Sequence, residues 1–182
     1  QTYAAQSEVI HWSHTVVTSS QTERVQLIEE YAICNSEKVK VIHDTILADT
    51  NDIVTSAEFA EKYGVHDCVL CVGDFDERHN QLSLIQALRR TNIPIVFIGG
   101  TIPGQQDYLA ECKKATNKIN GKVLFIEQVE SPTMIRSAMK NARVHVVPSW
   151  WETTLQMSMD AVLCGCNVVV TDRSPFREYL AD

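Results

Sequence analysis

Short apolar runs alternate with helical segments along most of this chain, and this alternation limits the possible folds more than any other feature. The apolar runs lie at residues 15–18, 39–42, 68–72, 95–98, 123–126, 144–147 and 168–171. Helical patterns lie between or beside them at residues 22–33, 57–63, 81–90, 105–119, 132–139, 153–163 and 175–180. Strands without polar alternation are buried on both faces. The pattern therefore predicts an α/β fold with a doubly wound, Rossmann-like parallel sheet.

Length and charge exclude several classes of protein. With 182 residues, 45% of them hydrophobic, the chain can bury one good core, or one domain and a piece of another. The net charge of −7 argues against a nucleic-acid partner, which requires a basic face. No apolar run reaches the ~18 residues of a membrane span, and no signal peptide is recognisable. We expect a cytoplasmic protein, or one peripheral at the inner face of the membrane.

The cysteines do not form a recognisable metal or disulfide pattern. They are Cys34, Cys68, Cys71, Cys112, Cys164 and Cys166. Cys68 and Cys71 form a C-x-x-C, but in a strand these two positions face opposite sides of the sheet and cannot readily share a metal ion. We expect buried free thiols in a reducing compartment, and no metal site.

The segment that says most about function lies near the end of the sequence. Strand 144–147 is followed by a loop, by Glu152 at the start of a predicted helix, by Asp160 two turns further, and by a turn into strand 168–171. A helix N-terminus behind a parallel strand binds anions, because its free N–H groups point at the ligand. Two carboxylates there suit hydroxyl groups on either side of a phosphate. The arrangement predicts a ligand with a diphosphate between two sugars, that is, a nucleotide sugar.

This segment resembles the donor-binding signature of GT-B fold retaining glycosyltransferases of group one, the glycogen-synthase-like type. That signature has two glutamates separated by seven residues, after a Pro-Ser pair; Glu152 and Asp160 hold these positions after Pro148-Ser149. The resemblance implies that Glu152 contacts the transferred sugar as the catalytic residue, and that Asp160 binds the ribose. Since the helix dipole favours a Glu in a first turn regardless of function, helix capping remains an alternative for Glu152.

The same resemblance implies further donor contacts. Thr153, Thr154 and Leu155 occupy the loop-to-helix turn beside the diphosphate, and Leu155 stands where the family usually has a Gly. Gln128, after strand 123–126, lies where the family recognises the base through the backbone.

Gly73 matches the family's glycine-led turn, in which two basic residues neutralise the donor diphosphate. Asp74 and His79 stand at those two positions, with Arg78 one residue earlier. The resemblance implies that Gly73, Arg78 and His79 bind the donor, whereas Asp74 would repel it. Adjacent helical positions point about 100° apart, so Arg78 and His79 are expected to diverge. A protonated His79 would tighten donor binding as the pH falls. A solvated turn without a ligand is the alternative.

The resemblance also predicts the domain organisation. Residues 1–45 are expected to be the tail of an N-terminal acceptor domain, 46–56 an interdomain linker, and 57–182 the C-terminal nucleotide-sugar-binding domain, truncated before its last helices. The chain would then be a fragment that lacks most of its N-terminal domain.

The predicted function is transfer of a hexose from a nucleoside diphosphate sugar to a hydroxyl of a glycan, lipid or small molecule, with retention, in carbohydrate or polysaccharide biosynthesis. No cofactor besides the donor is expected, and the fragment alone is expected to be inactive. One alternative is a non-catalytic GT-B-like scaffold or binding domain with a degenerate diphosphate site, which Asp74, His79 and Leu155 favour. Another is a sugar-nucleotide epimerase, which needs no acceptor.

Overall fold

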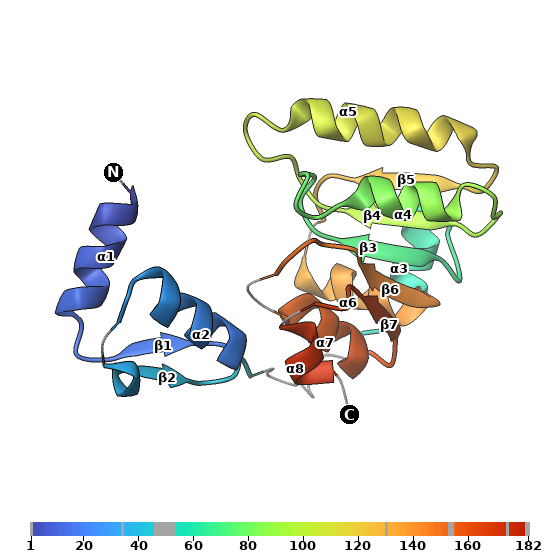
Figure 1. Ribbon diagram of the computed structural model, residues 1–182. Coiled ribbons are helices and arrows are strands. Elements are labelled where there is room, and N and C mark those ends of the chain that lie inside the picture. The colour runs from blue at the N-terminus through green and yellow to red at the C-terminus, as the bar shows by residue number, and fades with distance from the viewer. Residues whose placement is uncertain are drawn as a thin grey trace. The chain divides into compact units, whose positions relative to one another are not determined.

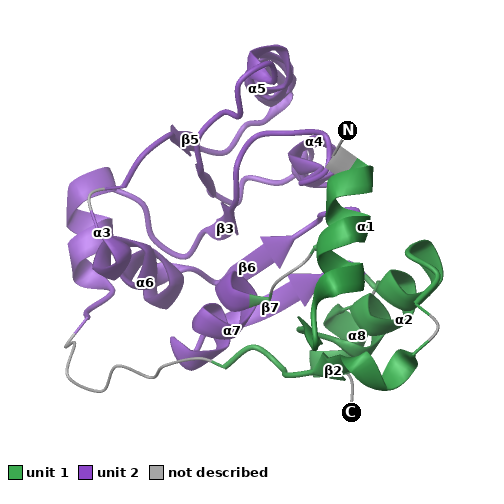
Figure 2. Ribbon diagram, turned by 90° about the vertical axis from the view of Figure 1, so that its left-hand side faces the viewer, with its two compact units in different colours: residues 1–45, 152–155, 172–182 green, residues 46–151, 156–171 purple. Residues whose placement is uncertain are grey.

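The computed structural model describes residues 2–33, 35–45, 54–129, 131–152, 155–173 and 175–180 (Figure 1). The chain forms two compact units. The first comprises residues 1–45, 152–155 and 172–182, and the second comprises residues 46–151 and 156–171 (Figure 2).

The second unit is built on a five-stranded parallel sheet with the order β5-β4-β3-β6-β7. Its strands are β3 (Val69–Val72), β4 (Ile95–Ile98), β5 (Val123–Ile126), β6 (Val144–Val147) and β7 (Asn167–Val170). The chain leaves β3 toward β4 and β5 on one side, then returns to place β6 and β7 on the other. This arrangement confirms the predicted doubly wound parallel sheet.

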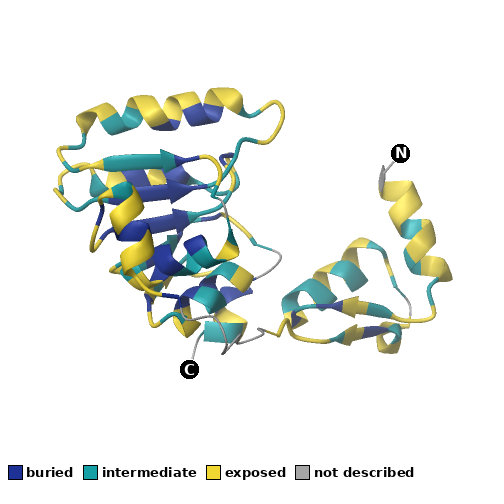
Figure 3. Cartoon of the chain, turned by 180° about the vertical axis from the view of Figure 1, so that it is seen from behind, coloured by how far each residue is buried: buried dark blue, intermediate teal, exposed yellow. Residues whose placement is uncertain are grey.

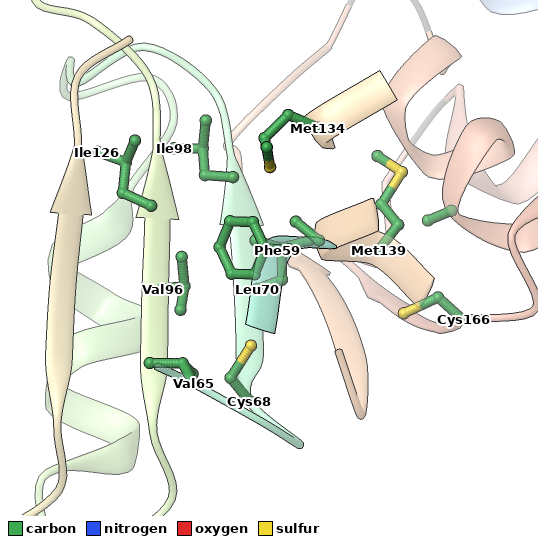
Figure 4. Close-up of a cluster of buried hydrophobic side chains, with 12 residues drawn as sticks. Phe59, Val65, Cys68, Leu70, Val96, Ile98, Ile126, Met134, Met139 and Cys166 are labelled. Carbon is green, nitrogen blue, oxygen red and sulfur yellow. The ribbon is translucent and has the colours of Figure 1, made fainter. Parts of the chain in front are cut away.

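Helices cover both faces of this sheet, because successive strand residues point to opposite sides. The helices are α3 (Ala57–Tyr63), α4 (Gln81–Leu88), α5 (Gln106–Ala115), α6 (Pro132–Asn141) and α7 (Gln156–Leu163). On one face, side chains from α3, α6 and α7 pack with Leu70 of β3 (Figure 4). On the other, side chains from α4 and α5 pack with Val69 and Cys71 of the same strand. Strand β4 is accordingly buried along its length, and so is β3 except at Val72, which is half-buried (Figure 3).

Cys68 and Cys71 lie in these two different clusters, on opposite faces as predicted. The described cysteines are all free; Cys164 is half-buried and the other four are buried. Burial raises the pKa of the Cys68 and Cys112 thiols to about 11, which keeps them protonated. Cys34 lies outside the described residues.

The first unit contains a two-stranded parallel sheet of β1 (Val16–Thr18) and β2 (Val39–Val41). Its helices are α1 (Thr2–Trp12), α2 (Gln21–Glu30), the short 3₁₀ helix η1 (Ser36–Lys38) and α8 (Phe176–Leu180). Ser20 caps α2, accepting a hydrogen bond from the Glu23 N–H. Sequence analysis did not predict α1, because its apolar residues form no buried stripe: Trp12 is 82% exposed.

The compact units divide the chain at other positions than the predicted domain ranges. Residues 152–155 and 172–182, which we assigned to the donor-binding domain, group with the first unit. Of the predicted linker, residues 46–53 lie outside the described part. Val54 and Thr55 are hydrogen-bonded to α6, through Lys140 and Ser137 respectively. Which unit serves which substrate stays a prediction.

None of the helices in the described part of the chain has the length and apolar character that crossing a bilayer requires.

His145 is a polar residue within the core of the second unit. It lies on β6 opposite Leu70 of β3, is 0% exposed, and neither ring nitrogen has a hydrogen-bond partner within the described residues. Burial lowers the pKa of His145 to about 4, because the charged imidazolium loses its hydration. The core therefore holds this histidine in its neutral form.

This burial predicts that the fold loses stability in mild acid. The folded-state pKa of His145 is below its unfolded value, so its contribution is complete above ~6.5 and is lost as the pH falls toward 4. We expect a loss of about 1 kcal/mol in unfolding free energy between about pH 7.5 and about pH 5.5, measured by urea denaturation. His145→Leu should remove this component, whereas the exposed control His66→Leu should retain it. An unchanged slope in His145→Leu would contradict the assignment.

Candidate functional site

The strand order places the candidate site at the carboxyl ends of β3 and β6. These strands are neighbours in the sheet, but their following chains diverge, to α4 after β3 and to α7 after β6 (Figure 1). Open α/β sheets bind ligands outside such a switch point. The two connections that meet there are residues 73–80 and the segment that begins at Pro148.

Glycines let the loops after β3 and β4 touch at this edge. A side chain at Gly99 would place its Cβ 2.1 Å from the Gly73 carbonyl oxygen. Gly73 itself has a φ of +154°, and a Cβ there would press on the His79 ring at 3.2 Å. The Gly73 N–H donates to the Ile98 carbonyl at 2.9 Å. These contacts fix the start of the turn that carries the candidate diphosphate-binding residues.

Asp74 has a local hydrogen-bonding role in this turn. Its Oδ1 accepts a hydrogen bond from the Gly100 N–H at 3.0 Å, and the Phe75 N–H donates to the Gly100 carbonyl at 2.8 Å. The Asp74 side chain is exposed. The residue thus ties the β3 loop to the β4 loop while it leaves a negative charge at the edge of the sheet.

Arg78 and His79 converge, contrary to the sequence-based expectation. An Nη of Arg78 lies 2.8 Å from Nε2 of His79, and Nδ1 of His79 lies 2.8 Å from Oδ1 of Asp76. The expectation of divergence was wrong because it assumed a helix; residues 77–79 form a turn, and α4 begins only at Gln81. The side chains of this turn therefore form a row, Asp76–His79–Arg78.

The hydrogen bonds of this row define the protonation of His79. A guanidinium group can only donate, so Nε2 of His79 must accept, and the ring proton is on Nδ1, facing Asp76. This is the neutral form of histidine. The geometry favours a neutral His79 over the cation that the family position suggests.

A second set of contacts joins this turn to the loop after β6. The Arg78 guanidinium lies over the Trp151 ring, 5.0 Å from its centroid, and the Trp150 N–H donates to the Arg78 carbonyl at 2.9 Å. The Asn80 side chain donates to the Pro148 carbonyl at 3.0 Å. Trp151 remains 55% exposed. The loops on the two sides of the switch point are therefore held together, and Arg78 of the β3 loop contacts the β6 loop through both its side chain and its backbone.

The two residues of the predicted acidic pair are assigned to different compact units. Asp160 lies half-buried on α7 in the second unit, and burial raises its pKa while Arg136 of α6 opposes the shift. Glu152 groups with the first unit and precedes the start of α7 by four residues. A helix dipole acts mainly within the first turn, so the capping alternative does not account for Glu152.

The remaining predicted residues are placed as follows. Leu155 is 2% exposed, and α7 begins after it rather than at residue 153. Thr153 and Thr154 lie outside the described residues. Gln128 is exposed in the loop after β5, and β4 separates β5 from β3. Among these residues, the structure brings together Gly73, Arg78 and His79.

Sequence analysis missed Asp76 and the contact of Trp151 with Arg78. Asp76 is buried, and its Oδ1 also accepts from the His79 backbone N–H at 2.8 Å. An Asp three residues before a His in a turn is a local signal for this bond. The contact of Trp151 with Arg78 joins segments far apart in the sequence, so no local pattern could have revealed it. Within the described ranges, no three His, Cys, Asp or Glu residues gather closely enough to hold a metal ion.

Comparison with known proteins decides the family. Residues 53–182 match the family described as glycosyl transferases group 1. The chain belongs to this family. A comparison with curated proteins found no match.

Several solved structures share the fold of this chain. Anabaena HepE, in complex with UDP and glucose, superposes with a TM-score of 0.79 at 19% identity, over 97% of this chain and 49% of HepE. Sucrose-phosphate synthase from Thermosynechococcus elongatus gives 0.76 at 17% identity, over 97% and 45%. A glycosyltransferase from Rickettsia africae gives 0.76 at 15% identity, over 92% and 47%. The chain spans about half the length of these proteins.

The contact between Gly73 and Gly99 yields a test of the site's architecture. Gly99→Ala should destabilise the fold by roughly 2–4 kcal/mol, because its Cβ would meet backbone atoms that cannot rotate away. Gly104→Ala is the matched control: it has a φ of +88° but open space around it, so only about 1 kcal/mol is expected. Urea denaturation measures both. Equal losses would contradict the close approach of the two loops.

Proposed function

We propose that the second unit binds a nucleoside diphosphate sugar at the carboxyl edge of its sheet, as the donor-binding portion of a retaining hexosyltransferase. The observation that carries this proposal is the position of Arg78, held between the loops after β3 and β6 at the switch point, in a chain of the group 1 family. The similar fold of HepE, solved with UDP and glucose and also with UDP-glucose, supports a UDP-sugar as the probe.

The predicted residues other than His79 take the following roles in this proposal. Arg78 faces the diphosphate, where a fixed cation stabilises the charge that develops on the leaving group. Asp160 binds the ribose and Glu152 contacts the transferred sugar as the catalytic residue. Gly73 and Leu155 approach the phosphates through the backbone, Thr153 and Thr154 contribute hydroxyl groups, and Gln128 lies at the base; the side chain of Leu155 is buried.

The acceptor side belongs to the proposal as well. We infer that residues 1–45 belong to an acceptor-binding domain, since the chain spans about half the length of the solved structures it matches. The acceptor is then a glycan, a lipid or a small molecule with a free hydroxyl. On this view the chain binds the donor but does not complete the transfer by itself.

A second candidate is a domain that keeps the fold without turnover. The charge of Asp74 supports it, because a carboxylate beside a diphosphate site weakens the electrostatic stabilisation on which transfer depends.

Calorimetry with UDP-glucose, with and without a chelator, tests the proposal. Binding that survives the chelator supports it; no heat of binding up to millimolar UDP-glucose would favour the scaffold. Release of a changed sugar without an acceptor would indicate the epimerase alternative.

The two acids should respond differently to substitution. Asp160→Ala should weaken UDP and UDP-glucose alike, by ~1–3 kcal/mol, because ribose hydroxyls lose their acceptor. Glu152→Ala should leave UDP binding nearly unchanged and weaken only UDP-glucose. The exposed control Asp107→Ala on α5 should bind both ligands as the parent does. Equal losses for both ligands in both variants would refute the division of roles.

Asp74 provides a separate prediction. Asp74→Asn keeps an oxygen for the Gly100 N–H but removes the charge, so UDP-glucose should bind about two- to tenfold more tightly. Asp74→Ala removes the charge and the hydrogen bond together, so it should also lower the thermal midpoint. Unchanged affinity in Asp74→Asn would show that this turn does not face the donor.

A further inference from the structure

Asp76, His79 and Arg78 form a graded row from the protein interior outward. Their side chains are 10%, 13% and 28% exposed, respectively. Asp76 Oδ1 accepts from both the backbone N–H and the ring Nδ1 of His79, and Asp76 Oδ2 lies 3.8 Å from Nε of Arg78. The inner end of the row is thus a carboxylate fixed by the turn, and its outer end is a guanidinium.

We propose that His79 is a positioning residue: in its neutral form it holds the Arg78 guanidinium against Trp151, and Arg78, not His79, is the cation that meets the donor diphosphate. This inference rests on the proposed function. A free arginine side chain loses rotamer freedom when it binds a ligand, and a guanidinium fixed beforehand avoids much of that cost. Three contacts fix it here: the His79 ring nitrogen, the Trp151 face and the Asp76 carboxylate.

The charged and titratable groups around His79 determine the effect of acid. On the same turn, the Asp76 carboxylate and the Arg78 guanidinium contact the two ring nitrogens of His79. Glu77 is exposed, and the Asp74 carboxylate accepts a hydrogen bond from the Gly100 N–H. From α5, the Tyr108 hydroxyl accepts a hydrogen bond from the Leu82 N–H; burial raises the pKa of Tyr108 far above its usual range, and the charge of Asp76 adds to this, so Tyr108 stays neutral. From the β6 loop, Trp150 and Trp151 carry no charge.

Protonation of His79 would disrupt the row. A proton on Nε2 removes the acceptor that Arg78 uses and sets two cationic N–H groups against each other. The guanidinium would have to leave its place over Trp151. Donor affinity is therefore expected to fall with pH, the opposite of what a directly binding histidine cation produces.

Calorimetry of the full chain with UDP-glucose between about pH 8 and about pH 6 tests this sign. We expect binding at least about threefold weaker at the acidic end. His79→Gln stays neutral at every pH, so its affinity for UDP-glucose should show a flat pH profile. The exposed control His66→Gln should keep the parent profile. Tighter binding in acid, or a pH profile that persists in His79→Gln, would overturn the inference.

A second readout does not depend on the donor. Imidazole ¹⁵N shifts, assigned by comparison with His79→Gln, should show a neutral ring protonated at Nδ1 at about pH 8. The other tautomer, or a charged ring, would overturn the inference. Binding without the predicted pH profile contradicts the inference alone. Absence of UDP-glucose binding at about pH 8 contradicts the proposed function and, with it, the anion-binding role of Arg78.

Discussion

Strands β3 and β6 pair in parallel at the centre of the five-stranded sheet, and the rest of the second unit is organised around that pairing. Both strands are covered on each face, by α3, α6 and α7 on one side and by α4 and α5 on the other. The pairing is also where the chain changes direction across the sheet. The same strand pair therefore contributes to the stability of the unit and determines where a ligand can bind. The loops after β3 and β6 lead to helices on opposite faces of the sheet, and the candidate site lies where these loops diverge.

This arrangement buries polar side chains in the core of the second unit. His145 lies on β6 without a described hydrogen-bond partner for its ring, beside the strand that leads into the candidate site. Gln81, at the start of α4, is also fully buried; its amide donates to the Asp74 carbonyl at 2.9 Å. That bond supports the turn from inside, so the position of Arg78 depends on core packing as well as on its own contacts.

The charges around the candidate site are not those of an anion site lined only by basic residues. The turn after β3 carries Asp74, Asp76 and Glu77 with a single arginine, Arg78. Asp76 is inward and hydrogen-bonded to the His79 ring, whereas Asp74 is bonded to the β4 loop. Electrostatic stabilisation of an anion here depends on where the guanidinium is held rather than on the number of cations, which is why its neighbours matter.

The sequence by itself determined the secondary structure of the second unit and its parallel sheet, because buried strands and their helices have local periodicities. Cys68 and Cys71 were correctly placed on opposite faces by the same reasoning. The same reasoning did not predict helix α1, because its apolar residues do not form a stripe along one side of the helix. The family was indicated separately, by the resemblance of the segment around Glu152 and Asp160 to a known signature. The site was less predictable. The sequence named Gly73, Arg78 and His79 as residues of one turn. That the side chains of Arg78 and His79 meet, and which ring nitrogen of His79 carries the proton, could be inferred only from the structure. Only the tertiary structure decided that Trp151 holds Arg78, because that contact joins residues 73 positions apart through the pairing of β3 with β6. Local sequence carries no information about such a pairing beyond the fact that both strands are buried.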